Sequence, residues 1–595
     1  MKQRILIFIT IFFYFILIFL LGKVAFSLLN SSVGGEIYFT DIFNILYHGL
    51  PLDLSMSGYL TAIPGFILIV SIWLKPSVIT KVFNIYFGFF LTLIAIITVV
   101  DIVVYPYWGF HFDSTVFLYL QKPKETFASA SFFQILLGLL ATIILAVALY
   151  IGYVYCIRKQ LQGLSVPKSI WKTAIVMFLL TGALFLPIRG GVTVSTMNVG
   201  KVYFTDRMFL NHAAINPQFN LMYSFFKSDD FASQYQFYPK DEALQAFVRL
   251  NYQAQSDSVS ELLNTDRPNI ILFILESFSA NVALDSVVAP NMSRFAKEGI
   301  LFDHFYANSF RTDRGLVSVL SGYPAHPTVA IMKYPQKTEN LPTIPKTLKD
   351  SGYENLSFYY GGDADFANMR SYFMGACGIK DVVADKDFPL NERMTKWGAP
   401  DKYLINRVYN DLTTKEQKQP FVKTVLTLSS HEPFDVPVTK FDHPFLNAVS
   451  YTDECLGEFV EKMKASDMWR NTLIIFVADH AMQSYPPGIN NSDPQRFRIP
   501  LVWIGGAVKS PRVITDYGSQ NDLAATLLSQ LRINHSQFKF SKDLLNKDVR
   551  KFAFYSYVNG FCLTDSTGTI TYDNDQRNII HQSGNPDLEK DAKVF

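Results

Sequence analysis

Residues that can bind a metal or move a proton follow three apolar, β-rich runs of the chain. They are Glu276 after NIILFIL (269–275), His431 after FVKTVLTL (421–428), and Asp479 with His480 after TLIIFV (472–477). Taken singly, a carboxylate after a strand is more often a helix N-cap, and an isolated histidine is more often a structural residue. Together, carboxylate oxygens and imidazole nitrogens are donors that hold divalent transition metals. Because ligands in open α/β sheets bind beyond the carboxyl ends of the strands, these side chains predict a metal site at one sheet edge.

A candidate nucleophile, Thr312, precedes a predicted helix over Asp313–Leu320. In the simplest interpretation its hydroxyl is an N-cap, which is a structural role. In the functional interpretation, the hydroxyl faces the dipoles of a helix N-terminus, which favour an alkoxide and an incoming anion. A threonine hydroxyl is a poor nucleophile unless coordination to a metal lowers its pKa. Thr312 therefore predicts chemistry only if the Glu, Asp and His cluster lies beside it.

Further strands and helices alternate along this part of the chain. NLSFYY (355–360) and IPLVWIGG (499–506) are typical of strands buried on both faces, whereas Asn291–Glu298 and Ala448–Ser466 are typical of helices. This alternation indicates an α/β domain with a mostly parallel central sheet. In such a sheet the candidate residues would meet at the same edge.

Five apolar runs precede this domain, and the first four are near or above the ~18 residues that indicate a membrane-spanning helix. They are Ile5–Leu21, Ser55–Leu74, Val82–Val100, Ser131–Ile157 and the shorter Thr173–Ile188. Lys2 and Arg4 before the first run would also suit a signal peptide, but the run lacks a clear cleavage site, which favours a retained helix. Lys and Arg in alternate loops place the N-terminus in the cytoplasm by the positive-inside rule. Five crossings then place the chain after Ile188 outside the membrane.

The composition excludes several classes of protein. The 595 residues are 49% hydrophobic and 17% charged, against roughly 25% charged residues in an average soluble domain. A net charge of +2 gives no reason to expect a nucleic-acid partner. The four cysteines contain no CxxC pair, which excludes a disulfide scaffold and a cysteine-based zinc finger. A pairing among Cys377, Cys455 and Cys562 stays open.

Several segments carry a resemblance to a known family. They are LESFS (275–279), RTDRGLVSVLSGYPA (311–325), SSHEPF (429–434), Tyr451-Thr452-Asp453 and FVADH (476–480). The spacing from Thr312 to Ser321-Gly322 resembles the nucleophile segment of the sulfatase and alkaline phosphatase superfamily. Threonine replaces the modified cysteine or serine of sulfatases, and the C-x-P-S-R sequence needed for formylglycine is absent. With five apolar runs, the layout resembles the lipoteichoic acid synthase family of phosphoglycerol transferases.

The resemblance implies roles for individual residues. Glu276, Thr312, Asp479 and His480 would be the ligands of one divalent metal, Mn²⁺ or Zn²⁺. His431 would be a general acid or a phosphate contact. Arg370, in GGDADFANMR, lies close to a phosphate-binding arginine of the relatives, and Trp397 belongs to another family-like segment. Both would contact the substrate, Trp397 in a role more structural than catalytic. Tyr360 stands where lipoteichoic acid synthases have a histidine, which departs from the family pattern.

The resemblance also implies a division of the chain. We expect a five-helix transmembrane domain (1–188), a juxtamembrane linker (189–268), a sulfatase-like catalytic domain (269–540), and a C-terminal strand with a polar tail (541–595). The expected protein is an enzyme of the cell (inner) membrane with an extracytoplasmic catalytic domain. It would move a phosphoglycerol-type group from a membrane phospholipid to an envelope glycan or lipid through a phospho-threonine intermediate. The alternatives are a hydrolase of sulfuric or phosphoric esters on the same scaffold, and a non-enzymatic lipid-sensing or assembly protein.

Overall fold

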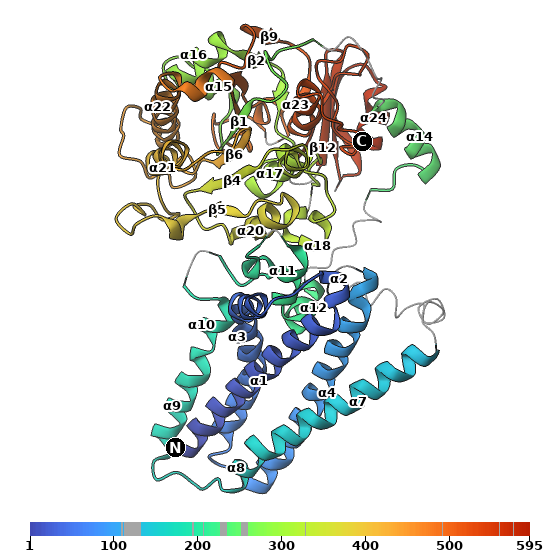
Figure 1. Cartoon of the computed structure of the whole chain (residues 1–595), viewed down its shortest axis with the longest axis vertical. Coiled ribbons are helices and arrows are strands. Elements are labelled where there is room, and N and C mark those ends of the chain that lie inside the picture. The colour runs from blue at the N-terminus through green and yellow to red at the C-terminus, as the bar shows by residue number, and fades with distance from the viewer. Residues whose placement is uncertain are drawn as a thin grey trace. The chain divides into compact units, whose positions relative to one another are not determined.

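A computed structural model shows two compact units, Met1–Asp230 and Phe231–Phe595, which are described separately (Figure 1). The described residues are 1–108, 111, 132–192, 195–205, 207–226, 235–251, 260–327, 329–490, 492–557, 560–574 and 576–595.

The first unit is helical, and five of its described helices are long and apolar enough to cross a membrane. They are α1 (Lys2–Leu29), α3 (Phe39–Val70), α4 (Pro76–Trp108), α7 (Phe132–Tyr153) with the turns that follow it, and α9 (Ile170–Ala183) with α10 (Phe185–Arg189). The five apolar helices predicted from the sequence are confirmed. The second helix begins at Phe39 instead of Ser55, and Ser131, the start of the fourth predicted run, lies outside the described residues.

Two short helices pack against the long ones within the first unit: α11 (Met208–Ala214) and α12 (Pro217–Phe225). Asn216 caps α12 by accepting from the amide of Phe219, and its side-chain nitrogen donates to Asp53 Oδ1 at 2.9 Å. Asp53 in turn forms a fully buried ion pair with Lys23, at 2.6 Å. Charges buried in an apolar bundle are retained only when they are paired, so this chain of contacts fixes α12 to α1 and α3.

The second unit is built on an eight-stranded sheet in the order β5-β4-β6-β1-β7-β8-β2-β9. All neighbours are parallel except β8, which runs antiparallel to β7 and β2. The mostly parallel sheet is therefore confirmed, and the five predicted strands are all present. The strands are β1 (Asn269–Leu275), β2 (Ile300–Phe302), β4 (Asn355–Tyr360), β5 (Asp381–Val383), β6 (Phe421–Leu426), β7 (Thr472–Ala478), β8 (Leu501–Ile504) and β9 (Arg512–Ile514).

Helices cover the sheet because its central strands are apolar on both faces. On one face, α16 (Pro290–Glu298) packs on α22 (Pro444–Lys464), which packs on α21 (Asp401–Thr414). Phe273 of β1 stacks on Phe476 of β7 at 5.4 Å and meets Phe459 of α22 edge-on at 5.2 Å. Elsewhere in the unit, α17 (Thr312–Ser321) packs on α23 (Leu523–Gln530) (Figure 1). Aromatic packing thus joins β1, β7 and α22 in the core.

The C-terminal part is more ordered than its polar sequence suggests. A single strand and a polar tail were expected over 541–595, whereas the structure has a four-stranded antiparallel sheet and a helix. Leu588 and Ala592 are buried, so the last helix is docked. The final strand is an edge strand exposed along most of its length, which explains why its sequence reads as polar. The elements are β11 (Ala553–Tyr557), β12 (Gly560–Asp565), β13 (Gly568–Asp573), β14 (Asn578–Gly584) and α24 (Leu588–Val594).

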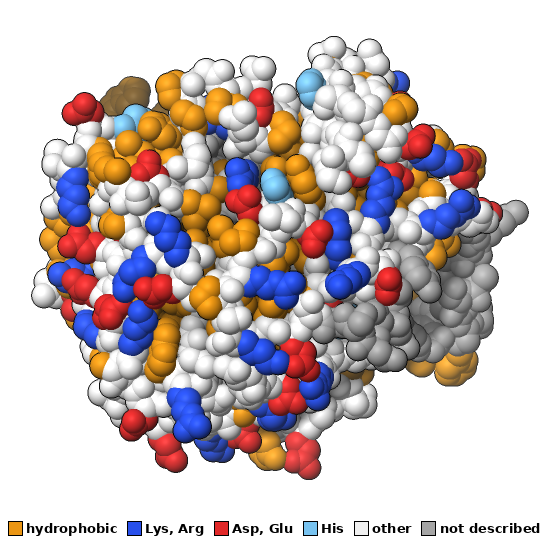
Figure 2. All heavy atoms as spheres, turned by 90° about the horizontal axis from the view of Figure 1, so that it is seen from above, with side chains coloured by type: hydrophobic (Ala, Val, Ile, Leu, Met, Phe, Trp, Pro, Cys, Tyr) orange, Lys and Arg blue, Asp and Glu red, His pale blue; other side chains and the backbone are white. Residues whose placement is uncertain are grey.

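The distribution of charged side chains on the surface agrees with the small net charge of the chain. On the face shown in Figure 2, Lys and Arg side chains are mixed with Asp and Glu side chains, as the small net charge leads one to expect.

All four cysteines are free thiols, and Cys377, Cys455 and Cys562 are buried. The open question of a pairing among these three is therefore answered against a disulfide.

Candidate active site

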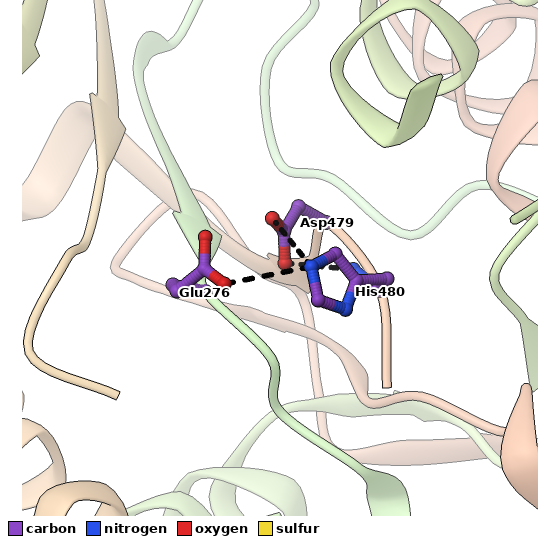
Figure 3. A group of neighbouring side chains, drawn as sticks. All are labelled: Glu276, Asp479 and His480. Atoms are coloured by element: carbon purple, nitrogen blue, oxygen red, sulfur yellow. Dashed lines mark hydrogen bonds and ion pairs between the residues drawn. The ribbon is translucent and has the colours of Figure 1, made fainter. Parts of the chain in front are cut away.

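Glu276, Asp479 and His480 meet at the carboxyl edge of the central sheet (Figure 3). The Nε2 atom of His480 lies 3.4 Å from Glu276 Oε1 and 3.5 Å from Asp479 Oδ2. One potential ligand atom of each residue lies within 4.8 Å of the others, which is close enough for one ion to contact all three. The structure therefore brings these three predicted ligands together.

Strand pairing places the two carboxylates next to each other. In the parallel pair of β1 and β7, Leu275 stands opposite Ala478, so the next residues, Glu276 and Asp479, leave the sheet side by side. The amide of Glu276 donates to Thr427 Oγ1 at 2.8 Å, and Ser430 Oγ donates to the Glu276 carbonyl at 2.6 Å. These bonds tie the end of β1 to the segment that follows β6.

The surroundings of Asp479 leave one carboxylate oxygen for a ligand. Its Oδ1 accepts from the amides of Ser277 (2.9 Å) and His480 (2.7 Å). Ser277 itself adopts a φ of +60°, an uncommon conformation for a non-glycine residue. Within the described part of the chain, Oδ2 of Asp479 is buried and has no hydrogen-bond partner. A buried carboxylate oxygen without a partner is costly, and a bound cation would satisfy it. The residues present thus fit a divalent metal.

Proximity and burial shift the ionisation of all three groups. Burial raises the pKa of Asp479, and the adjacent Glu276 carboxylate raises it further, to about 8. Burial alone would lower the pKa of His480, but Asp479 and Glu276 outweigh burial and raise it to about 10. Burial opposes ionisation of Glu276 too, yet His480 and His431 lower its pKa to about 2. The cluster without a metal is thus a crowded set of charges that a divalent cation would relieve.

Thr312 lies beside this cluster as the first residue of α17. Its Oγ1 donates a hydrogen bond to Glu276 Oε2 at 3.0 Å. The N-cap position of α17 is occupied by Arg311, which makes no side-chain capping bond. The simple capping interpretation of Thr312 is therefore wrong, because the hydroxyl points to a predicted metal ligand instead of an amide of its own helix.

The close approach of α17 to Asp479 depends on residues that the sequence did not single out. A side chain at Gly315 would place its Cβ 1.9 Å from the Asp479 carbonyl oxygen, so the helix reaches this position only with glycine. The side chain of Gln520 donates to the carbonyls of Ala478 and Asp479, each at 2.7 Å. A glycine after R-T-D-R is a signal that sequence reasoning could use, whereas nothing in the sequence marks Gln520.

His431 and Trp397 lie together near the cluster. Their rings are 4.4 Å apart, and the indole nitrogen of Trp397 donates to the Glu432 carbonyl at 2.8 Å. The same carbonyl accepts from His431 Nδ1 at 2.8 Å, which makes Nε2 the nitrogen that can exchange a proton with a substrate. The effect of His431 on the pKa of Glu276 indicates that the two residues share one electrostatic environment.

Arg370 and Tyr360 have different surroundings. The Nε of Arg370 donates to Asp365 Oδ1 at 2.5 Å, and among the described residues Arg370 forms no hydrogen bond or ion pair with the Glu, Asp and His cluster. Tyr360 ends β4 and is buried, and its pKa is raised by burial and then by the nearby carboxylates of Glu276 and other acids. A neutral phenol thus stands near the cluster at the position where the resemblance leads one to expect a histidine.

Two residues of the family-like Tyr451-Thr452-Asp453 segment have structural contacts. Thr452 donates to Asp401 Oδ2 at 2.6 Å, and Asp401 accepts from the amide of Leu428 at 2.7 Å, just before His431. Asp453 accepts from the amides of Asn291 and Met292 at the start of α16. Thr452 and Asp453 thus hold α22 to α21 and α16.

The comparisons with known proteins agree with this architecture. Residues 268–533 match the family model described as Sulfatase. The solved structure of a protein in the alkaline phosphatase superfamily from Vibrio parahaemolyticus matches with a TM-score of 0.52 and 25% identity, over 60% of this chain and 95% of that one. The second unit is therefore a sulfatase-like domain of the alkaline phosphatase superfamily.

Two curated relatives narrow the assignment. The chain is 26% identical over 372 residues to lipoteichoic acid synthase-like YvgJ of Bacillus subtilis (strain 168), across 55% of this chain and 59% of that protein. It is 30% identical over 219 residues to phosphoglycerol transferase I of Xanthomonas campestris pv. campestris, across 34% of this chain and 30% of that protein. The matches thus span less than two thirds of either relative. The chain is therefore similar over part of its length to lipoteichoic acid synthase-like and phosphoglycerol transferase proteins.

Proposed function

We propose that the protein transfers a phosphoglycerol-type group from a membrane phospholipid to a hydroxyl acceptor, an envelope glycan or lipid. The observation that carries the proposal is the position of the Thr312 hydroxyl, which donates a hydrogen bond to Glu276 beside Asp479 and His480. A hydroxyl at the start of a helix faces backbone N–H groups that favour an incoming phosphate. The names of the two curated relatives and the five apolar helices support a membrane-associated transferase.

Glu276, Thr312, Asp479 and His480 would hold the metal, Mn²⁺ or Zn²⁺. Two carboxylates, an imidazole and a hydroxyl suit either ion. When bound, the metal would lower the pKa of the hydroxyl and offset negative charge on the phosphate oxygens. Asp479 Oδ2, which is buried and accepts no hydrogen bond among the described residues, is the part of the site that supports this cofactor most directly.

The chain's own side chains supply the remaining steps. Thr312 Oγ loses its proton to solvent, which a bound metal would favour by lowering the pKa of the hydroxyl, and forms a bond to phosphorus while the bond from phosphorus to the diacylglycerol oxygen breaks. His431 Nε2 protonates that leaving oxygen. In the second half, His431 takes the proton of the acceptor hydroxyl, whose oxygen displaces Thr312 Oγ from phosphorus, and Thr312 regains its proton. Trp397 orients His431 through the shared Glu432 carbonyl. Arg370 would contact the phosphate only after exchanging its bond to Asp365.

The proposal is tested with full-length protein in detergent, Mn²⁺ and phosphatidylglycerol. We expect diacylglycerol release and a phosphoglycerol adduct on the peptide that contains Thr312, both detected by mass spectrometry. Phosphatidylethanolamine is the comparison donor. Faster turnover of sulfate esters, without a covalent adduct at Thr312, would instead establish the ester hydrolase that the sulfatase-like domain also allows. Absence of both metal and turnover would favour a lipid-sensing or assembly role.

A further inference from the structure

A buried arginine, Arg314, lies on α17 two residues after Thr312. Arg314 is 9% exposed, and within the described part of the chain its Nε and Nη1 atoms are buried without a hydrogen-bond partner. The guanidinium lies 4.9 Å from the centre of the Phe310 ring, a contact that provides no hydrogen-bond acceptor in the plane of Nε and Nη1. A buried charge that lacks its hydrogen bonds destabilises the fold, so such a residue needs an explanation.

Arg314 lines a pocket of about 160 Å³. Val317 of the same helix and Tyr323 form part of its apolar wall, and individual described residues between Pro324 and Lys337, including His326 and Lys337 themselves, contribute the rest. The neighbouring Asp313 is not part of the lining, and its carboxylate lies 3.5 Å from Lys333 Nζ. The pocket thus combines apolar walls with side chains that are positive or can become so, and among the described residues no carboxylate lines it.

The pocket is separate from the cluster of Glu276, Asp479 and His480. Successive helical residues turn by roughly 100°, so Arg314 points about 200° around α17 from Thr312, toward the opposite side of the helix. Gly315 faces the Asp479 carbonyl, and Glu276, Asp479 and His480 are absent from the pocket lining. An anion that contacts Arg314 in this pocket therefore lies on a different side of α17 from the Thr312 hydroxyl.

The chemistry of Arg314 indicates which ligand would complete the pocket. A guanidinium offers a planar fork of N–H donors that matches two oxygens of a phosphate or carboxylate, and burial strengthens such bonds. The apolar walls exclude water from the bond and suit a ligand that carries carbon on the other side of the anion.

We propose that the Arg314 pocket binds a second phosphate, carried by the phosphoester acceptor or by a donor headgroup and distinct from the phosphate that is transferred. This second site rests on the proposed transferase function, because a transferase must position both a donor and an acceptor at the same nucleophile. A phosphate held on the far side of α17 would fix the orientation of the molecule whose hydroxyl or ester enters the site. Arg314 would be a substrate-binding residue with no part in bond making.

The first experiment measures phosphate binding and stability of the full-length protein in detergent, for the wild type, Arg314→Met and Arg314→Lys. Inorganic phosphate and glycerol phosphate are titrated while the thermal unfolding midpoint is recorded. We expect Arg314→Met to be at least as stable as the wild type without phosphate, because methionine removes an unpaired buried charge. We also expect its apparent affinity for phosphate to fall about tenfold or more, since a charge-assisted bond is lost. Arg314→Lys should retain part of the affinity.

A second measurement keeps the proposal testable if Arg314→Met does not fold. Wild-type protein is treated with phenylglyoxal, and modification of Arg314 is followed by peptide mass spectrometry with and without phosphate. Protection by inorganic or glycerol phosphate would identify a soluble phosphoester as the ligand, whereas protection only by phosphatidylglycerol micelles, compared with phosphatidylcholine micelles, would identify the donor headgroup. A loss of stability in Arg314→Met with an unchanged phosphate response, or no protection by either source, would overturn the proposal.

The binding result does not depend on turnover. Thr312→Ala removes the proposed nucleophile but leaves the Arg314 pocket on the other side of α17. Phosphate should therefore still protect Arg314 in Thr312→Ala. Failure of the transferase proposal and failure of the second phosphate site thus give different results.

Discussion

Replacement of Thr312 by alanine tests both the chemistry and the geometry of the site. The hydroxyl does not cap α17, and its contact is the 3.0 Å hydrogen bond to the Glu276 carboxylate. Loss of a hydrogen bond to a charged group costs about 1.5–3 kcal/mol, more than the ~1 kcal/mol expected for a lost N-cap. The Glu276 carboxylate keeps its bond from Ser277 Oγ, at 2.8 Å, so the lower end of that range is expected. The folded protein should persist.

Activity should respond far more strongly than stability. Removal of a covalent nucleophile lowers turnover on the order of 10⁴-fold or more, whereas Thr312→Ser keeps a hydroxyl and should retain measurable activity. Diacylglycerol release from phosphatidylglycerol measures turnover, intact mass reports the adduct, and thermal unfolding reports stability. Thr452→Ala is a matched control, because it also removes a buried hydroxyl-to-carboxylate hydrogen bond, the 2.6 Å bond to Asp401, but one that involves none of Glu276, Asp479 and His480. It should lose stability and keep most of its activity.

Two results would each refute this reasoning. If Thr312→Ala released diacylglycerol at a rate near that of the wild type, Thr312 could not form the covalent intermediate. If Thr452→Ala abolished turnover as completely as Thr312→Ala, the loss would reflect general damage to the domain instead of the missing nucleophile.

Three further predictions concern the metal, the pH dependence of stability and the topology. Asp479→Asn should lower the bound Mn²⁺ or Zn²⁺ measured by elemental analysis, because it removes a charged ligand; unchanged metal content would contradict the assigned site. Burial lowers the pKa of Lys423 to about 8, against about 10.4 in an unfolded chain. The unfolded chain therefore binds more protons between these two pKa values, so the free energy of unfolding should rise with pH across this window. Lys423→Met should stabilise the domain at pH 7 by up to roughly 3 kcal/mol and progressively less toward pH 10. An equal gain at both pH values in unfolding measurements would refute the burial argument. A reporter fused at Ser165 should be cytoplasmic and one fused after Phe595 extracytoplasmic, and finding both on one side would exclude five crossings.

The sequence by itself determined where the long apolar helices and the buried strands lie. Apolar runs identify the membrane helices and the buried strands, because burial on all sides leaves a continuous stretch of hydrophobic residues. The β1, β6 and β7 strands and the residues that follow them could be predicted for the same reason. Parallel strands share a carboxyl edge, so the meeting of Glu276 with Asp479 and His480 follows from the order of strands and helices.

Only the tertiary structure decided how the site is held and what surrounds it. The Thr312 hydroxyl could cap its helix or contact a ligand 36 residues earlier in the chain, and only the packing of α17 on Asp479 through Gly315 decides for the latter. The ion pair of Arg370 with Asp365 and the missing partners of Arg314 are likewise properties of three-dimensional contacts. The polar residues of the last strand carry little hydrophobic signal because an edge strand needs few buried side chains. Contacts between residues distant in sequence leave no local pattern, so folding alone determines them.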